Sequence, residues 1–490
     1  MVNKNESCNK LPIDKDGSLL LFSIDDCPGS VPAAGNCKGT SHNNVGENGN
    51  YWSSTPNESN DKNAYNLNFN SGNHKVNWNN RNNGHTVRPV SELTQQSVSS
   101  TFSITKKQLL LDLYKAYKDA RRNKRGRSYQ LKFEFNLEEN LINLRDELFS
   151  RTYKPLPSNC FIIHDPKMRE VFAANFRDRI VHHLFYNYTH ILFERTFIFD
   201  SYSCIKNRGT HFGIDRLKHH IRSVSASYSK PCYVLKIDIK GYFMNINRET
   251  LLALCRQSLT KMKNHNTDKN GKPWNMLIDY SFVDYLLETI INTNPIENCN
   301  MLGNVSDWNN LPPDKSLFHS RLDCGLPIGN LSSQLFSNVY MNIFDQYVKR
   351  NLKCKHYGRY VDDAYIVADN REYLKSLIPK LDAFLRSNLG LALHPDKTRV
   401  FNAYQGIEFL GAYLKPFRTY ISSSSLRRIR KNIHSQPYTN YKQLKSSVNS
   451  YLGVLSHYNS YCLRRVLFGH KSKLNRFSKF SSDWLTFGNE

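Results

Sequence analysis

Three features are missing from this 490-residue sequence, and each absence excludes a class of protein. The eleven cysteines include no C-x-x-C pair, which argues against a zinc site and against a disulfide framework. Their odd number favours reduced thiols, as in a cytoplasmic protein. No run of eighteen apolar residues occurs, and the first residues lack the apolar core of a signal peptide. We therefore expect no membrane association.

Acidic residues are the third absence. From Phe409 to Ser482 there is no Asp or Glu, against fourteen Lys and Arg. Charge of one sign over this length repels itself unless an anionic partner is bound. The whole chain carries a net charge of +25 with 12% aromatic residues, which suits nucleic acid with stacked bases. A merely basic soluble protein is the alternative, because net charge does not determine fold.

Two adjacent carboxylates stand out in residues 358–367, which read GRYVDDAYIV. Alternation on both sides predicts two short strands with Asp362 and Asp363 at the turn between them. Neighbouring acids repel each other, so their burial requires a counter-ion, and Mg²⁺ prefers such oxygen ligands. A solvated acidic turn is the alternative.

A second stretch, residues 233–243, reads YVLKIDIKGYF and places Asp238 at the end of an apolar strand. Taken alone, Asp238 could simply cap a following helix. Together, the two stretches supply three carboxylates from distant strands. This is what two metal ions in phosphoryl transfer require.

These two motifs resemble the palm of reverse transcriptases, with a first carboxylate in D-x-x-x-(F/Y)-F and two more in Y-x-D-D. The resemblance implies that Asp238, Asp362 and Asp363 are catalytic, and that they hold two Mg²⁺ ions together with Ile239. Asp238 and Asp362 would chelate both ions, and Asp363 would assist. Phe243 would lie under the sugar and exclude ribonucleotides.

Basic residues of the expected fingers match further motifs of this family. By the resemblance, Arg169 and, more loosely, Lys167 hold the incoming triphosphate, for which a forked guanidinium is suited. Arg208 and Gly209 would touch the template or primer backbone. Surface salt bridges are the alternative for Arg169 and Lys167.

Residues 325–338 read GLPIGNLSSQLFSN and predict a turn that opens a helix, with a cap at Ser332 or Ser333. Most reverse transcriptases show P-Q-G-x-x-x-S-P here, whereas this chain has Ile328 for Gln and Gln334 for Pro. Those departures resemble the reverse transcriptases of diversity-generating retroelements, which misincorporate opposite template adenines. Ile328 and Gln334 are therefore expected to set fidelity. Ile328 and Gly329 would also contact the dNTP.

The remaining site residues lie further along the chain. Lys397 matches a palm lysine that the resemblance places near the triphosphate or pyrophosphate, with a surface lysine as the alternative. Residues 409–416 resemble the primer-grip hairpin. In the expected thumb, four cations are candidates for contact with the duplex: Arg427, Arg428, Arg430 and Lys431.

Residues 1–95 differ from the rest, with sixteen asparagines between Asn43 and Gly84. Their composition predicts a poorly ordered leader with weak strand pieces. Residues 51–55, 64–69 and 87–90 resemble the C-type-lectin-like proteins that retroelements diversify. Residues 40–90 would then be a translated template repeat or a remnant of a variable domain. A disordered leader without a role is the alternative.

The sequence thus predicts an α+β right-hand polymerase with an antiparallel palm sheet. We expect an Asn-rich leader (1–95), a helical basic extension (96–152), fingers (153–224), palm (225–416) and a helical thumb (417–490). The resemblance implies a bacterial or phage enzyme that copies a template-repeat RNA from a DNA primer using dNTPs, with errors at adenines. It also implies a small basic oligomeric accessory protein. A phage-defence reverse transcriptase and a lectin-like binding module at the N-terminus are the alternatives.

Overall fold

The computed structural model describes residues 36–38, 41–43, 49–56, 63–69, 74–80, 102–122, 126–164, 167–265, 267–268, 271–272, 274–435, 441–468 and 479–489. The chain divides into two units, Met1–Ser100 and Thr101–Glu490. Most of the expected leader, and residues 123–125 of the basic segment that follows the first helix, lie outside the described residues. Among the helices that are described, none has the length and apolar character needed to cross a bilayer.

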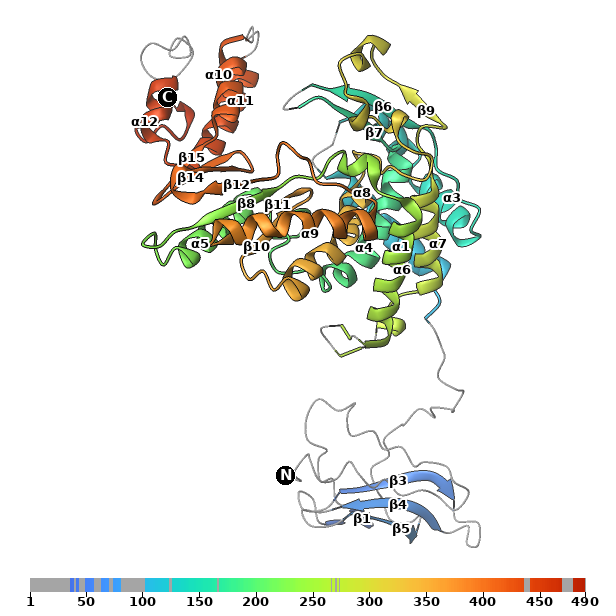
Figure 1. The fold of residues 1–490 in the computed structure, drawn as a ribbon. Coiled ribbons are helices and arrows are strands. Elements are labelled where there is room, and N and C mark those ends of the chain that lie inside the picture. The colour runs from blue at the N-terminus through green and yellow to red at the C-terminus, as the bar shows by residue number, and fades with distance from the viewer. Residues whose placement is uncertain are drawn as a thin grey trace. The chain divides into compact units, whose positions relative to one another are not determined.

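The first unit contains antiparallel strands (Figure 1). They are β1 (Asn36–Lys38) paired with β2 (Ser41–Asn43), and a sheet of β3 (Gly49–Pro56), β4 (Asn63–Phe69) and β5 (His74–Asn80) in sequential order. The sequence predicted only weak strand pieces here, because asparagine disfavours strands. Apolar and aromatic residues nevertheless alternate in β4, at Tyr65, Leu67 and Phe69, and this alternation is typical of a strand.

The second unit begins with three helices that pack against a long fourth one. They are α1 (Lys106–Arg121), α2 (Ser128–Phe135), α3 (Leu137–Phe149) and α4 (Phe176–Glu194). Helix α1 starts where the Thr105 side chain accepts a hydrogen bond from the Gln108 amide, 3.2 Å away. Its buried residues Leu109, Leu113 and Ala116 follow helical spacing. The predicted helical extension is therefore present.

The fingers sheet contains a strand that the sequence did not predict. Strands β6 (Ser158–Ile163) and β7 (Arg169–Ala173) form an antiparallel hairpin, and β9 (Cys299–Met301) joins β6 in parallel. The polar insertion of residues 295–324, which bears Asn, Pro and Asp, predicts a long surface loop, and β9 shows that this prediction is wrong for residues 299–301. The insertion is held by Glu170, a buried carboxylate of β7 that accepts hydrogen bonds from the Trp308 indole and the Leu317 amide.

The palm sheet has four antiparallel strands in the order β10-β11-β8-β12. They are β8 (Tyr233–Ile237), β10 (Tyr357–Tyr360), β11 (Asp363–Ala368) and β12 (Arg399–Asn402). The predicted antiparallel palm sheet is thereby confirmed. The sequence placed both Asp362 and Asp363 in the hairpin turn, but the turn consists of Val361 and Asp362, and Asp363 already pairs with Tyr360.

Alternate residues of the palm strands face opposite layers, as the period of a strand requires. Leu235, Ile237 and Ile366 share one core with the buried stripe of α9 (Arg371–Leu389), which runs along the sheet in Figure 1. Val234 and Tyr365 face the other way and pack with α5 (Thr210–Val224).

Three further helices pack against α4, in the core that they share with the sheet. They are α6 (Arg248–His265), α7 (Tyr280–Asn292) and α8 (Leu331–Gln346). Helix α8 contacts α4, α6 and α9, and most of its residues are buried. The predicted serine cap is wrong: Asn330 precedes the helix without a side-chain cap, and Ser332 instead bonds to His182 of α4 at 2.7 Å.

The C-terminal part begins with a small sheet of β13 (Ile407–Phe409), β14 (Ala412–Lys415) and β15 (Arg418–Ile421). The helices α10 (Ser423–Ser435), α11 (Tyr441–Ser456) and α12 (Tyr461–Phe468) follow, with the strand pair β16 (Lys479–Phe480) and β17 (Phe487–Asn489). They share a separate core, in which Leu444, Val448, Leu452 and Leu455 of α11 are buried. This helical spacing of apolar residues agrees with the helical thumb that the sequence predicts.

Candidate active site

Asp238 and Asp363 lie across from each other at one end of the palm sheet. Ile237 of β8 pairs with Ala364 of β11, so the next position of the same ladder brings Asp238 opposite Asp363. Strand β8 reaches this point because its apolar residues are buried on both faces. The side chains of Asp238 and Asp363 remain 23% and 32% exposed, so solvent and substrate can reach them.

Asp362 lies in the two-residue turn beside this pair. Val361 precedes it with a φ of 58°, a left-handed conformation that is rare for a β-branched residue. Backbone strain of this kind persists where the surrounding structure holds it, and it is frequent at functional sites. The turn therefore fixes the direction in which Asp362 leaves the backbone.

The three acids interact electrostatically. The pKa of Asp362 is raised to about 6, first by burial and then by the negative charges of Asp363 and Asp238. Burial raises the pKa of Asp363 as well, and Asp238 adds to this effect. A neighbouring carboxylate raises a pKa in this way because like charges disfavour the ionised form, so a bound cation would relieve the repulsion.

Cations from three segments surround these acids. The Lys397 ammonium lies 2.9 Å from a carboxylate oxygen of Asp238, and the Lys236 ammonium lies 3.9 Å from Asp363. Positive charge partly offsets these rises in pKa: that of Arg169 at Asp362, and that of Lys236 and Lys167 at Asp363. The sequence selected Lys167, Arg169 and Lys397 as ligands of a triphosphate. The fold places Lys397 in contact with Asp238, and it places Lys167 and Arg169 near enough to act on the turn electrostatically.

The backbone of Asp238 is fixed by the segment that carries Lys397. The His394 amide donates to the Asp238 carbonyl at 2.8 Å, and Ile239 forms a bridge with Leu393. Ile239 itself is buried. This contact explains how a lysine 159 residues away in sequence reaches the first carboxylate.

The residues present suit divalent cations in their chemistry, because carboxylate oxygens are the preferred ligands of Mg²⁺. Within the described residues, however, no three Asp, Glu, His or Cys side chains are grouped so that they could hold an ion. Asp238 and Asp363 point their oxygens at lysines instead. The Lys397 ammonium therefore competes with any other cation for that oxygen of Asp238.

Ile328 and Phe243 pack against one small hydrophobic cluster, whose buried members include Cys160, Phe172 and Leu317. The Phe172 amide of β7 donates to the Ile328 carbonyl at 2.9 Å, so the loop extends the edge of the fingers sheet. Gly329 follows with a φ of 130°, and a Cβ atom there would lie 2.9 Å from the Phe172 carbonyl oxygen. Only glycine fits this position.

Gln334 lies away from this cluster, on the exposed side of α8. Its side-chain oxygen accepts a hydrogen bond of 3.1 Å from the Cys204 thiol, on the segment that precedes α5. Ile328 and Gln334, which the sequence paired as fidelity determinants, therefore occupy different surroundings.

The candidate nucleic-acid contacts fall in two places. Arg208 donates to the carbonyls of Ile198 and Ser201 and stacks on Phe199, so its guanidinium is engaged within the protein, and Gly209 precedes helix α5. Four cations lie on α10: Arg427, Arg428, Arg430 and Lys431. Of these, Arg427, Arg430 and Lys431 are exposed.

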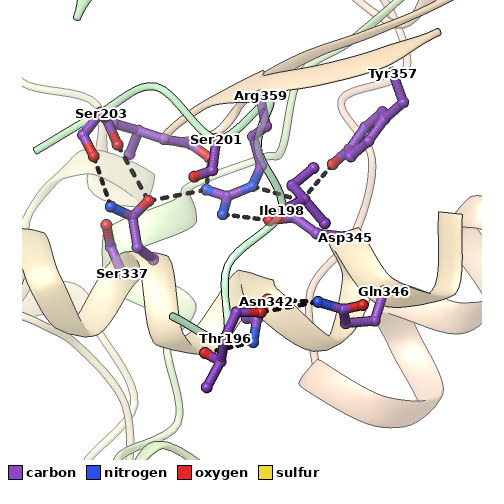
Figure 2. Close-up of polar contacts among 12 residues, drawn as sticks. Thr196, Ile198, Ser201, Ser203, Ser337, Asn342, Asp345, Gln346, Tyr357 and Arg359 are labelled. Carbon is purple, nitrogen blue, oxygen red and sulfur yellow. Dashed lines mark hydrogen bonds and ion pairs between the residues drawn. The ribbon is translucent and has the colours of Figure 1, made fainter. Parts of the chain in front are cut away.

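Sequence reasoning missed the residues that support the acids. Arg359 stands two positions before the turn, is fully buried and pairs with Asp345 of α8, which is also fully buried (Figure 2). Glu170, next to Arg169, anchors the insertion. Arg359 could have been found from the sequence, because it is the single charged residue within its strand. A charged side chain is seldom buried at such a position unless it has a partner.

Two family models match the sequence. Residues 164–414 match the model described as reverse transcriptase (RNA-dependent DNA polymerase), and residues 28–90 match a domain of unknown function, DUF8237. The first match covers half of the chain and includes every one of the acids discussed above.

The known proteins and solved structures that resemble this chain share little sequence identity with it. The chain is 24% identical to protein YkfC of Escherichia coli over 302 residues, which cover 55% of this chain and 69% of that protein. It is 21% identical to the putative COX1/OXI3 intron 2 protein of Saccharomyces cerevisiae over 295 residues, 54% of this chain and only 33% of the relative.

Among solved structures, the apo telomerase of Candida tropicalis aligns with a TM-score of 0.39 at 13% identity, over 64% of this chain and 56% of that one. The telomerase of Candida albicans in complex with a fragment of telomeric RNA aligns with a TM-score of 0.38 at 12% identity, over 71% and 58%. The chain thus spans little more than half of either telomerase.

Proposed function

Because this chain belongs to the reverse transcriptase family, we propose that Asp238, Asp362 and Asp363 catalyse RNA-templated DNA synthesis. The reaction is attack of a primer 3′-hydroxyl on the α-phosphate of a dNTP, with release of pyrophosphate. The single observation that carries the assignment of residues is the convergence of the three carboxylates at the end of β8 and β11. Two bound Mg²⁺ ions would supply the positive charge that activates the hydroxyl and stabilises the leaving group.

Each protein group has a proposed task in this reaction. Asp238 and Asp362 hold the metal ions, with Ile239 beside them and Asp363 assisting. Arg169 and Lys167 hold the triphosphate, a task for which their cationic groups near the acids are suited.

Three further side chains complete the nucleotide site. Phe243 lies under the sugar, and Ile328 contacts the nascent base pair, as their shared cluster allows. Lys397, whose ammonium lies 2.9 Å from Asp238, would be available to the triphosphate or pyrophosphate when it does not pair with that carboxylate. The exposed cations of α10 grip the duplex backbone.

We further propose that the enzyme belongs to the diversity-generating class and copies a template-repeat RNA with errors at adenines. Support comes from Ile328, an aliphatic residue that supplies only shape where a glutamine would add hydrogen bonds to the base pair. A small basic accessory protein would be a partner. In this proposal, residues 1–95 form the leader, 96–152 the extension, 153–224 the fingers, 225–416 the palm and 417–490 the thumb.

The test is extension of a DNA primer on an RNA template with dNTPs and Mg²⁺, followed by sequencing of the products. We expect Asp362→Asn with Asp363→Asn to abolish synthesis while RNA binding is retained. Full synthesis by this double variant would overturn the assignment. Untemplated products would instead favour the phage-defence class, and templated products without excess errors at adenines would refute the diversity-generating class.

A second candidate function concerns the first unit. Its described strands form an antiparallel sheet, and residues 28–90 match a domain model of their own. A binding module resembling lectins is compatible with both observations. Limited proteolysis of the full chain tests this: a resistant fragment that includes residues 36–80 supports a folded module, and complete digestion up to residue 100 contradicts it.

A further inference from the structure

Arg359 is the largest side chain with no exposure in the described part of the protein. Burial of a guanidinium is unfavourable unless every polar group finds a partner. Asp345, its partner on α8, is also fully buried. The pair lies next to the turn that carries Asp362, and Arg359 contacts the turn directly.

The two side chains meet in a forked, two-bond arrangement. Nε of Arg359 donates to one carboxylate oxygen of Asp345 at 2.8 Å, and Nη2 donates to the other at 2.7 Å. The Tyr357 hydroxyl donates a third bond to Asp345 at 2.6 Å. Figure 2 shows the guanidinium pointing at Asp345, with Tyr357 approaching from the other side. The Asp345 carboxylate is therefore locked in one orientation.

The remaining guanidinium nitrogen reaches the turn itself. Nη1 donates to the Val361 carbonyl at 2.8 Å and to the Asn338 side-chain oxygen at 3.3 Å. Val361 is the residue with left-handed backbone that immediately precedes Asp362. The hydrogen bond to its carbonyl fixes the peptide plane from which Asp362 projects.

The backbone of Arg359 extends the same network to a third segment. Its amide donates to the Asp200 carbonyl at 2.9 Å, and its carbonyl accepts from the Tyr202 amide at 3.0 Å. Asn338 of α8 donates to the Ser203 carbonyl at 2.8 Å. Arg359 thus joins the turn and helix α8 through its side chain, and residues 200–202 through its backbone.

We propose that Arg359 is a positioning residue for DNA synthesis, which holds the Val361–Asp362 turn in register with α8 through its buried pair with Asp345. This inference rests on the proposed function, because it takes Asp362 as a metal-binding carboxylate. Helix α8, to which the pair ties the turn, begins at Leu331, just after Ile328 and Gly329. The turn and the loop proposed to contact the base pair are therefore both connected to the same helix.

Lysine cannot replace arginine in this role. Three separate directions are used, two to Asp345 and one to Val361, and they match the planar fork of a guanidinium. An ammonium group could keep the charge pair but would release the Val361 carbonyl. Arg359→Lys is therefore the variant that separates the charge from the geometry.

The experiment measures single-nucleotide extension by the full chain, at a temperature where circular dichroism shows each variant folded. We expect Arg359→Lys to lower kcat on the order of 10- to 100-fold, because small misplacements of catalytic groups have effects of that size. The KM for dNTP should stay within about twofold, since the triphosphate ligands lie elsewhere. Hydrogen exchange of the peptide spanning residues 357–367 should become faster.

A double variant separates positioning from stability. Arg359→Met with Asp345→Leu replaces the pair by apolar groups, a change that often preserves or raises stability. We expect it to regain thermal stability but to keep the low kcat. Arg256→Lys is the matched control, because Arg256 forms a forked pair with Asp284 between α6 and α7, away from the turn, and should retain full activity.

Recovery of kcat together with stability in the double variant would overturn the proposal, and so would wild-type kcat in folded Arg359→Lys. Failure of the proposed function has a different signature. If Asp362→Asn extends primers as well as the wild type does, the carboxylates are not catalytic. If Asp362→Asn is inactive and Arg359→Lys is normal, only the positioning role is refuted.

Discussion

The ammonium group of Lys397 lies 2.9 Å from a carboxylate oxygen of Asp238, one of the residues proposed to hold a metal ion. The side chain of Lys397 is 55% exposed and that of Asp238 is 23% exposed, and exposed pairs contribute only about 0.2–1 kcal/mol to stability. A divalent ion can therefore displace the lysine easily. In the protein without metal, the contact lowers the repulsion between Asp238 and the neighbouring carboxylates. It also keeps Lys397 close to the reaction that it is proposed to assist.

Lys397→Met should tighten metal binding and slow the reaction. Because the lysine no longer competes for Asp238, we expect the half-saturating Mg²⁺ concentration to fall by up to about fivefold, the equivalent of about 1 kcal/mol. We expect kcat to fall as well, since a cation near the pyrophosphate is lost. Mn²⁺ binding followed by paramagnetic resonance and Mg²⁺ titration of primer extension measure the two effects. Lys375→Met, which removes an exposed lysine paired with Glu372 on α9, is the control and should change neither.

Ile328→Gln should lower the error rate opposite template adenines. Ile328 packs with Phe243 in a small cluster, so a longer amide placed there would extend toward the base pair and would favour correct hydrogen-bonding geometry. Sequencing of cDNA made on a defined RNA measures the error spectrum. Ile328→Leu keeps the aliphatic character and should leave the spectrum unchanged. Identical spectra for Ile328→Gln and the wild type would contradict the proposed fidelity role.

Gly329→Ala should destabilise the loop that follows Ile328. Its φ of 130° and the 2.9 Å approach of a Cβ atom to the Phe172 carbonyl oxygen leave no room for a methyl group. We expect a loss of about 1–3 kcal/mol in the free energy of unfolding and a higher KM for dNTP. Denaturant unfolding and steady-state extension measure these quantities. Gly453→Ala in α11 is the control, because nothing lies within 4 Å of its added Cβ, and it should be neutral or slightly stabilising.

Glu170→Ala should release the insertion of residues 295–324. The buried Glu170 carboxylate accepts hydrogen bonds from Trp308 at 2.7 Å, Ser316 at 2.9 Å and the Leu317 amide at 2.6 Å. Removal leaves these donors without an acceptor, and we expect a loss of about 2–5 kcal/mol. Faster tryptic cleavage at Lys315 and Arg321 would report the release. Glu297→Gln alters an exposed carboxylate of the same insertion and should leave cleavage unchanged.

Acidification should destabilise the protein through His220. This buried imidazole accepts from Arg216 and bonds to the Tyr365 hydroxyl, and burial together with the Arg216 charge lowers its pKa to about 3, although Asp200 opposes the shift. The unfolded chain binds a proton near pH 6.5 and the folded chain does not, so stability rises with pH between about 3 and 6.5.

The slope from this residue is at most about 1.4 kcal/mol per pH unit. Urea unfolding between pH 4 and pH 8 measures it. His220→Gln should flatten the curve below pH 6.5, whereas His319→Gln, on the insertion, serves as the control and should preserve the wild-type slope. An unchanged slope in His220→Gln would show that another group causes the acid sensitivity.

Local sequence patterns predicted the strands that carry the acids and the helices that cover them. Alternation around Asp362 and the apolar run before Asp238 are properties of neighbouring residues, so they are visible without the fold. That these acids hold metal ions was inferred from their resemblance to the palm of reverse transcriptases, and it stays a prediction.

The supporting contacts were not predictable from local patterns. Strand β9 pairs with residues about 140 positions earlier, and its three residues have too little alternation to indicate a strand. Arg359 and Asp345 lie in different elements, and only the packing of α8 behind β10 makes them partners. The strands of the first unit were likewise predicted only as weak pieces, because asparagine disfavours strands. The alternation of the larger residues was given too little weight.

Both strands that lead to the proposed metal-binding carboxylates are hydrogen-bonded on each side. Asp238 follows β8, which lies between β11 and β12, whereas β10, which leads to Asp362, pairs with β11 on one side and bonds through Arg359 to Asp200 and Tyr202 on the other. The turn that carries Asp362 is thus tied to a segment about 160 positions earlier in the sequence. A substitution that shifts residues 200–203 would therefore alter the position of a carboxylate that lies far from them in the sequence.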